Sequence, residues 1–426
     1  MIKIFYSFLI SCFIFTIFSC GQTTEENVTS AVSKTGDAVN DTAGTVNDGV
    51  FGGTDGSGRQ CPPRGTFQKN IYARQVKQTN DCGYIVASSG GYLKKLDEFG
   101  ETKWETKITL YQAKHSNLGK PSVIQTRDGG YLYSDENGIA KLSSSGEIEW
   151  KNRKYRDFTD AIQHSNGYYY LVSEALEHKT AKGKVYKFNS KGKKIWMKGF
   201  GRGCYREEFN SIIESSDGEL IIVGAKSHSN KSFSCTFEWY DDAWIIKVDA
   251  DKGGKIWEKT YGGKNYEQFE DIVRNPNGGY YAIGTACNKK NPPEAGDYCA
   301  KNMSAHWMKI DESGNSLKAK FFTNGPNQTG FSITNTPSGG TAWVGLNKKY
   351  VGSTALYRAV FYKLKGTMIA YRKVVDLGSG NATSIELTKD GGFIIAAGKN
   401  VIKTDSDMEI PTLNTACYRS NKNLCP

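Results

Sequence analysis

The chain has 426 residues, a formal net charge of +11 and 23% charged residues, together with 24 tyrosines, 20 phenylalanines and 47 glycines. This composition excludes a wholly disordered chain and favours a turn-rich β protein. The lysines and arginines are scattered over many turns instead of forming one basic helix or run. We therefore expect a solvated surface and no nucleic-acid binding.

The first residues predict export. The stretch "MIKIFYSFLISCFIFTIFSCGQ" has one early cation, Lys3, and then an apolar run whose length suits a signal peptide better than a membrane span. The run ends in "IFSCG", which resembles a bacterial lipobox. This resemblance implies that residues 1–20 are a lipoprotein signal peptide and that Cys20 is the lipid attachment site. The implied location is the bacterial cell envelope, periplasmic or surface-exposed; an ordinary signal peptide is the alternative.

Residues 21–60 are rich in Thr, Asn, Asp, Gly and Ser and carry few large apolar side chains. Such a segment cannot offset its ordering entropy by burial, so we predict a disordered tether. A short amphipathic helix is the alternative. Residues 61–426 are predicted to form the folded body with a short C-terminal extension.

Two sequence marks recur seven times in the body. The first is a turn followed by an alternating apolar run, as in "DGGYLYS", "SDGELIIVG" and "KDGGFIIAAG". The second mark begins with the pattern apolar-x-Lys-apolar, which a short polar residue follows. A glycine stands three residues after that polar residue, and in four copies a tryptophan stands four residues after the glycine. The polar residue can bond the backbone of the turn, and the glycine supplies the positive φ that closes it.

These marks predict four short antiparallel strands per unit. Seven such sheets, each unable to bury both faces alone, are predicted to form an all-β, seven-bladed β-propeller. The tryptophans Trp104, Trp150, Trp196 and Trp257 are expected to pack between neighbouring units. The last unit lacks a clear outer strand. We expect the stretch Thr66–Ile71 to supply it, with Phe67 in the tryptophan position; Met408–Thr412 is the alternative.

The repeats resemble those of quinoprotein-type (PQQ-like) β-propellers over about residues 66–405. They look closest to propellers of bacterial lipoproteins and secreted proteins of unassigned function. Quinoprotein dehydrogenases of this kind have eight units and an adjacent cysteine pair, which this chain lacks. We therefore expect no cofactor. The turn "DADKGG" resembles the start of a calcium loop, but Gly253 stands where Asp or Asn is needed, so we expect no metal.

Eight cysteines follow the signal peptide, an even number that suggests disulfides in an exported protein. The predicted pairs are Cys204–Cys235 and Cys287–Cys299, because each pair lies in loops that leave one face of the propeller. The remaining cysteines, Cys61, Cys82, Cys417 and Cys425, are expected to pair among themselves. The two long loops between the second and third strands of the fourth and fifth units would then form a stiff wall.

That wall carries Phe237, Trp239, Tyr240 and Asp241, an aromatic and acidic cluster of the composition found at interfaces. We expect it to bind a protein or glycan partner. The prediction is a monomeric, non-catalytic binding or scaffold module attached to the membrane by its lipid. One alternative is an outer-membrane assembly scaffold. Another is a hydrolase or lyase in the central channel, for which Glu208, Asp271 and Glu386 are the candidate residues.

Overall fold

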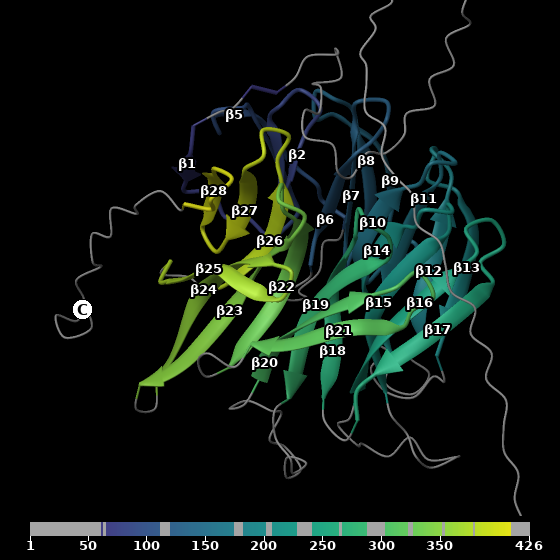
Figure 1. Ribbon diagram of the computed structural model, residues 1–426. Coiled ribbons are helices and arrows are strands. Elements are labelled where there is room, and N and C mark those ends of the chain that lie inside the picture. The colour runs from purple at the N-terminus through teal and green to yellow at the C-terminus, as the bar shows by residue number, and fades with distance from the viewer. Residues whose placement is uncertain are drawn as a thin grey trace, which may run out of the picture. The chain divides into compact units, whose positions relative to one another are not determined.

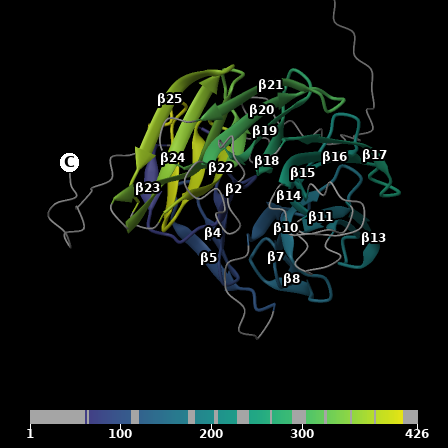
Figure 2. The ribbon, with the colours of Figure 1, turned by 90° about the horizontal axis from the view of Figure 1, so that it is seen from below.

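The computed structural model describes residues 61–409, except 63–64, 111–119, 174–181, 202–206, 228–240, 264–265, 288–302, 323–326, 352–353 and 378–379. The described strands form seven four-stranded antiparallel sheets (Figure 1). The innermost strand of each sheet contacts the innermost strands of its two neighbours, and these contacts close into a ring. The fold is therefore a seven-bladed β-propeller, as the repeats predict. Figure 2 shows the blades following one another around the centre.

The first four blades each use four consecutive strands, which follow one another from the centre outward. They are β2 (Gln75–Gln78), β3 (Tyr84–Ser88), β4 (Tyr92–Leu96) and β5 (Thr102–Lys107); β6 (Ser122–Gln125), β7 (Tyr131–Asp135), β8 (Gly138–Leu142) and β9 (Ile148–Asn152); β10 (Phe158–Gln163), β11 (Tyr169–Ser173), β12 (Gly183–Phe188) and β13 (Lys194–Phe200); and β14 (Glu208–Glu214), β15 (Leu220–Ser227), β16 (Asp241–Val248) and β17 (Lys255–Tyr261).

Blades five and six follow the same order, and blade seven differs in its outer strand. Their strands are β18 (Glu267–Arg274), β19 (Tyr280–Cys287), β20 (Met303–Ile310) and β21 (Ser316–Phe322); β22 (Gln328–Asn335), β23 (Thr341–Val351), β24 (Thr354–Lys365) and β25 (Met368–Val375); and β26 (Ala382–Leu387), β27 (Phe393–Ala397), β28 (Asn400–Thr404) and β1 (Phe67–Lys69).

The N-terminal strand closes the ring, which confirms the predicted closure. β1 pairs antiparallel with β28, with Phe67 opposite Lys403 and Lys69 opposite Val401. A disulfide between Cys61 and Cys82 holds the segment before β1 against the first turn of blade one, and it agrees with the expected pairing among four cysteines. Blade seven is thereby tied to blade one both by backbone hydrogen bonds and by a covalent link.

The recurring glycines and tryptophans do the packing that the sequence predicts. Gly146 and Gly192 have positive φ of 87° and 72°, so they close their turns in a conformation that suits glycine. A Cβ on Gly146 would lie 2.7 Å from the Trp104 ring of the preceding blade, and one on Gly192 would lie 2.7 Å from Trp150. Phe67 meets Gly100 in the same way. The turn glycine is thus also the docking surface for the aromatic ring of the neighbouring blade.

The lysine of the repeat has a structural role that sequence reasoning missed. Lys95, Lys141 and Lys403 are buried, and their Nζ atoms lie 2.9, 2.9 and 3.0 Å from the carboxylates of Asp81, Asp128 and Asp390 respectively. Each aspartate belongs to the Asp-x-Gly turn between the first two strands of the same blade. The ion pair therefore fastens the third strand of a blade to that turn.

No helix in the described parts of the chain is long and apolar enough to cross a membrane.

Candidate functional site

A β-bulge recurs at one position of the innermost strand. In five blades one extra residue interrupts the pairing with the second strand, between Phe158/Asp160, Phe209/Ser211, Phe269/Asp271, Gly330/Ser332 and Ala382/Ser384. A bulge bends its strand and redirects the side chains beside it. Here it presents the residue that follows the bulge to the neighbouring blade, next to the central channel.

The residues at this position in all seven blades form a closed set of contacts around the channel, which we call the channel belt. Its members at equivalent positions are Gln75, Ser122, Asp160, Ser211, Asp271, Ser332 and Ser384. Each boundary between blades is crossed by a hydrogen bond from or to one of these side chains. The belt thus joins neighbouring innermost strands, which no sheet hydrogen bond connects. At five boundaries a backbone N–H donates to a belt side chain, and at the other two the bond joins two side chains.

The two carboxyls of the belt accept most of these bonds. Asp160 accepts the Ile212 backbone N–H at 3.0 Å and the Ser122 hydroxyl at 3.0 Å. Asp271 accepts the Ile333 backbone N–H at 2.9 Å and the Ser332 hydroxyl at 2.9 Å. Burial raises the pKa of both carboxyls, although these hydrogen bonds act in the opposite direction.

Ser211 lies between the two carboxyls. Its Oγ is 3.2 Å from Asp160 Oδ2 and 2.9 Å from Asp271 Oδ1, but one hydroxyl carries only one hydrogen to donate. The hydroxyl therefore donates to one carboxyl, and its contact with the other is a hydrogen bond only when that carboxyl is protonated. The raised pKa of both carboxyls acts in this direction.

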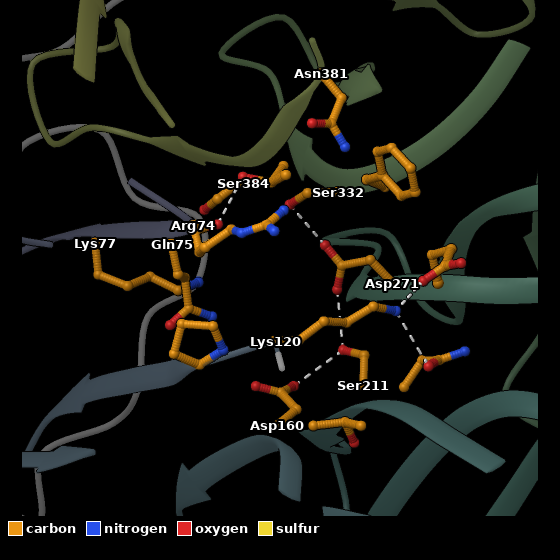
Figure 3. A pocket seen from close by; sticks show the side chains of 16 residues that line it. Arg74, Gln75, Lys77, Lys120, Asp160, Ser211, Asp271, Ser332, Asn381 and Ser384 are labelled. Carbon is orange, nitrogen blue, oxygen red and sulfur yellow. Dashed lines mark hydrogen bonds and ion pairs between the residues drawn. The ribbon is translucent and has the colours of Figure 1, made fainter. Parts of the chain in front are cut away.

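The belt separates two halves of the channel. One half is a cavity of about 240 Å³, which we call the funnel (Figure 3), and the other is a cavity of about 310 Å³. Both cavities are lined by belt residues, among them Asp160, Ser211 and Asp271. The funnel is also lined by side chains at the beginnings of the innermost strands. The other half is lined by residues near the ends of those strands.

The funnel opens on the face of the propeller that carries the long loops. In blade five, Glu267 at the beginning of β18 pairs with Ala286 near the end of β19. The end of a second strand leads into the connection to the third strand, which is the connection that is long in blades four and five. The funnel therefore opens on the face where β15 and β19 end.

Three cations line the funnel, and two of them have carboxylate partners. Lys120 Nζ lies 2.5 Å from Glu270 Oε2 and 3.4 Å from Asn210 Oδ1. Lys77 Nζ lies 3.8 Å from Glu386 Oε1. Arg74 is different, because its Nε donates to the Ser89 hydroxyl at 3.0 Å and no carboxylate among the described residues pairs with it.

The residues predicted for the channel are only partly placed there. Asp271 lies in the belt and lines both cavities, and Glu386 lines the half opposite the funnel. Glu208 lines neither. Sequence reasoning missed Asp160, although "FTDA", "FNSI" and "FEDI" share Phe, one residue, Ser or Asp, and an apolar residue. That shared pattern is the signal that would have found the belt in blades three to five.

The predicted partner wall falls largely outside the described residues. Phe237, Trp239 and Tyr240 lie there, and so do Cys20, Cys204, Cys235, Cys299, Cys417 and Cys425. Asp241 is described: it begins β16, is buried and accepts a hydrogen bond from Ser227 Oγ at 3.1 Å. Cys287 ends β19 and is disulfide-bonded. The partner wall and the pairings Cys204–Cys235 and Cys287–Cys299 stay predictions.

The described residues hold no group of three or more His, Cys, Asp or Glu side chains that could bind a metal ion.

Comparisons with known proteins identify the fold. No family profile and no curated protein matches the chain. A streptogramin B lyase structure matches with a TM-score of 0.50 and 12% identity, covering 79% of this chain and 97% of that one. The WD40 β-propeller domain of Doa1 matches with a TM-score of 0.50 and 12% identity, covering 80% and 93%. A protein of unknown function from Bacteroides caccae matches with a TM-score of 0.39 and 14% identity, covering 64% and 88%.

The streptogramin B lyase and Doa1 structures agree with the strand pairing that the chain is a β-propeller. At this level of identity the likeness concerns the fold alone, since propellers carry many unrelated functions.

Proposed function

We propose that the protein is a non-catalytic binding module of the bacterial cell envelope, attached to a membrane through lipid on Cys20. Its ligand, a protein or a glycan, would sit over the funnel, beside the wall that carries Phe237, Trp239, Tyr240 and Asp241. The observation that carries this proposal is the funnel itself. It is a polar cavity of about 240 Å³, built on a rigid belt and open on the face that bears the longest loops.

The chemistry of the belt favours binding over catalysis. A general acid or base must be free to exchange a proton with a substrate. Asp160 and Asp271 instead accept backbone N–H groups and serine hydroxyls from neighbouring blades, so their oxygens are already used to hold the ring together. The residues that line the funnel include no histidine.

One observation favours a hydrolase or lyase as the second candidate. Burial raises the pKa values of Asp160 and Asp271, and a general acid requires a carboxyl whose pKa is raised. Under this alternative one of these carboxyls would pass a proton to a substrate in the channel. The two candidates differ in whether a bound ligand is chemically changed.

Screening the full-length protein in detergent against a glycan array and against purified envelope proteins tests the proposal. Asn381 lines the funnel, so Asn381→Trp should fill the cavity and abolish retention of the ligand. Asn80, which is exposed in a turn at the opposite end of blade one, provides the matched control Asn80→Trp. Retention that is equal in both variants would contradict the site. A retained ligand whose mass changes on incubation would favour the enzyme.

A further inference from the structure

Arg74 brings an unneutralised positive charge into the funnel. It precedes β2, and its backbone is fixed because its N–H donates to Ala87 at 2.8 Å and its carbonyl accepts the Thr383 hydroxyl at 2.7 Å. Nε donates to Ser89 Oγ at 3.0 Å, which sets the plane of the guanidinium. Figure 3 shows the guanidinium pointing toward the middle of the cavity. Because Nε makes the anchoring bond, the two terminal nitrogens are left to meet a planar anion.

The remaining charges of the funnel do not compete for Arg74. Glu270 is taken by Lys120 at 2.5 Å, and Asp160 and Asp271 are held in the belt. Lys77 lies beside Glu386 and Lys120 beside Glu270, so Arg74 is the cation of the funnel with which no carboxylate of the described residues pairs. Its charge favours a ligand that carries a negative charge.

The neutral part of the lining suits a hydroxylated ring. Asn381 faces the cavity across from Lys120 and Asp271 in Figure 3, and its amide can both donate and accept. The Thr159 and Thr383 hydroxyls donate to backbone carbonyls and can still accept a hydrogen bond, and Phe331 supplies an apolar surface. A cavity of about 240 Å³ is smaller than the roughly 300–1,000 Å³ of sites for drug-sized ligands, so it accepts about one sugar ring.

We infer that the funnel binds an acidic monosaccharide unit, with its carboxylate on the terminal nitrogens of Arg74 and its hydroxyls on the amide and hydroxyl groups around the mouth. This inference rests on the proposed binding function and specifies its ligand class. A planar guanidinium can hold a carboxylate by two parallel hydrogen bonds, which a lysine cannot do. Arg74 is thus the residue that would distinguish an acidic sugar from its neutral counterpart.

Titration calorimetry on the full-length protein in detergent tests the inference, with galacturonate and glucuronate as probes and galactose and glucose as their neutral counterparts. We expect the wild type to bind an acidic sugar at least tenfold more tightly than its neutral counterpart. Arg74→Gln should abolish this preference, and Arg74→Lys should show only part of the preference of the wild type. Arg127→Gln is the matched control, because Arg127 is exposed at the opposite end and its guanidinium donates to the backbone carbonyls of His164 and Ser165.

The outcomes separate this inference from the proposed function. If acidic and neutral sugars bind equally and Asn381→Trp abolishes both, the funnel is a glycan site and the acidic preference is overturned. Acetate or inorganic phosphate that binds as tightly as a uronate would show recognition of a bare anion and would also overturn it. If no probe binds the wild type, the inference fails. The proposed binding function would still stand if the wild type retained another ligand and Asn381→Trp abolished that retention. Thermal melting of each variant confirms that it is folded.

Discussion

At the scale of single residues, the boundary between blades four and five contains two buried carboxyls. Glu267 begins β18, Asp242 belongs to β16, and both are at most 8% exposed. The gap they share exists because residue 262 is glycine: a Cβ there would lie 2.2 Å from Asp242 Oδ1 and 2.9 Å from Glu267 Oε2. At the boundary between blades three and four, a Cβ on Gly201 would likewise lie 2.0 Å from Glu207 Oε2. The acid pair of Asp242 and Glu267 is therefore a local variant of a repeated contact.

This pair should make stability depend on pH. Burial, and secondly the charge of Asp242, raises the pKa of Glu267 from 4.5 to about 7. The folded state thus binds the proton more tightly than the unfolded state. The protonated Glu267 therefore contributes fully to the free energy of unfolding below pH 4.5, and this contribution is lost as the pH rises through 7. In Glu267→Gln the decrease in the free energy of unfolding from low to high pH should be smaller by about 3 kcal/mol. The measurement is the free energy of unfolding in urea at pH 5 and pH 8.

A smaller slope should remain in Glu267→Gln, because burial also raises the pKa values of Asp160 and Asp271. Glu147→Gln is the control, since Glu147 is exposed and should leave the wild-type slope unchanged. An unchanged slope in Glu267→Gln would show that the shared gap does not hold Glu267 protonated.

At the scale of elements, β1 contributes more than its three residues suggest. It supplies the backbone hydrogen bonds that β28 would otherwise leave open, and Phe67 covers Gly100 and lies 5.7 Å from the Tyr84 ring, centroid to centroid. The Cys61–Cys82 disulfide spans 21 residues and fixes the same segment. Cys82 has φ 64°, and it occupies the turn position where the equivalent residues Gly129 and Gly218 also have positive φ.

Truncation separates the contribution of the tether from that of the closing strand. Deleting residues 21–60 should leave the melting temperature nearly unchanged, whereas deleting residues 21–71 should lower it severely, because blade seven then exposes β28 and the ring opens. A Cys61→Ala/Cys82→Ala variant is the control for the disulfide, whose loop contributes about 3 kcal/mol. Equal melting of the two truncated proteins would contradict closure by β1. Thermal unfolding followed by circular dichroism makes the comparison.

The elements also show what could be predicted from sequence and what could not. The turns, the tryptophan docking and the closing strand were predictable because each depends on local chemistry that repeats, such as the glycine that both closes a turn and receives Trp104. The channel belt was not predicted. Its members are Gln, Ser or Asp on seven separate strands, and they meet only when the ring is closed. Arg74 and Asn381 belong to different ends of the chain, so the funnel has no sequence motif of its own.

At the scale of the whole molecule, a radial arrangement separates the contacts that hold the ring from the proposed binding site. The belt and the docked aromatic rings hold the blades, while the funnel and the connections between second and third strands lie on one face. Substitutions at the funnel mouth, such as Asn381, touch no contact between blades that the belt supplies. On the proposed binding function, ligand specificity can therefore change on this face without altering the ring.

The attachment of this propeller to a membrane is the last prediction. If Cys20 carries a diacylglycerol and an N-acyl chain, the buried methylenes contribute about 0.8 kcal/mol each, and more than one chain is enough for stable anchoring. Cys20→Ala should therefore move the protein from the detergent phase to the aqueous phase, and mass spectrometry should show lipid on the N-terminal peptide of the wild type alone. Cys12→Ala, which changes a cysteine within the same apolar run, should partition like the wild type. Detergent-phase partition of Cys20→Ala equal to that of the wild type would remove Cys20 as the anchor and leave the ring and its funnel unaffected.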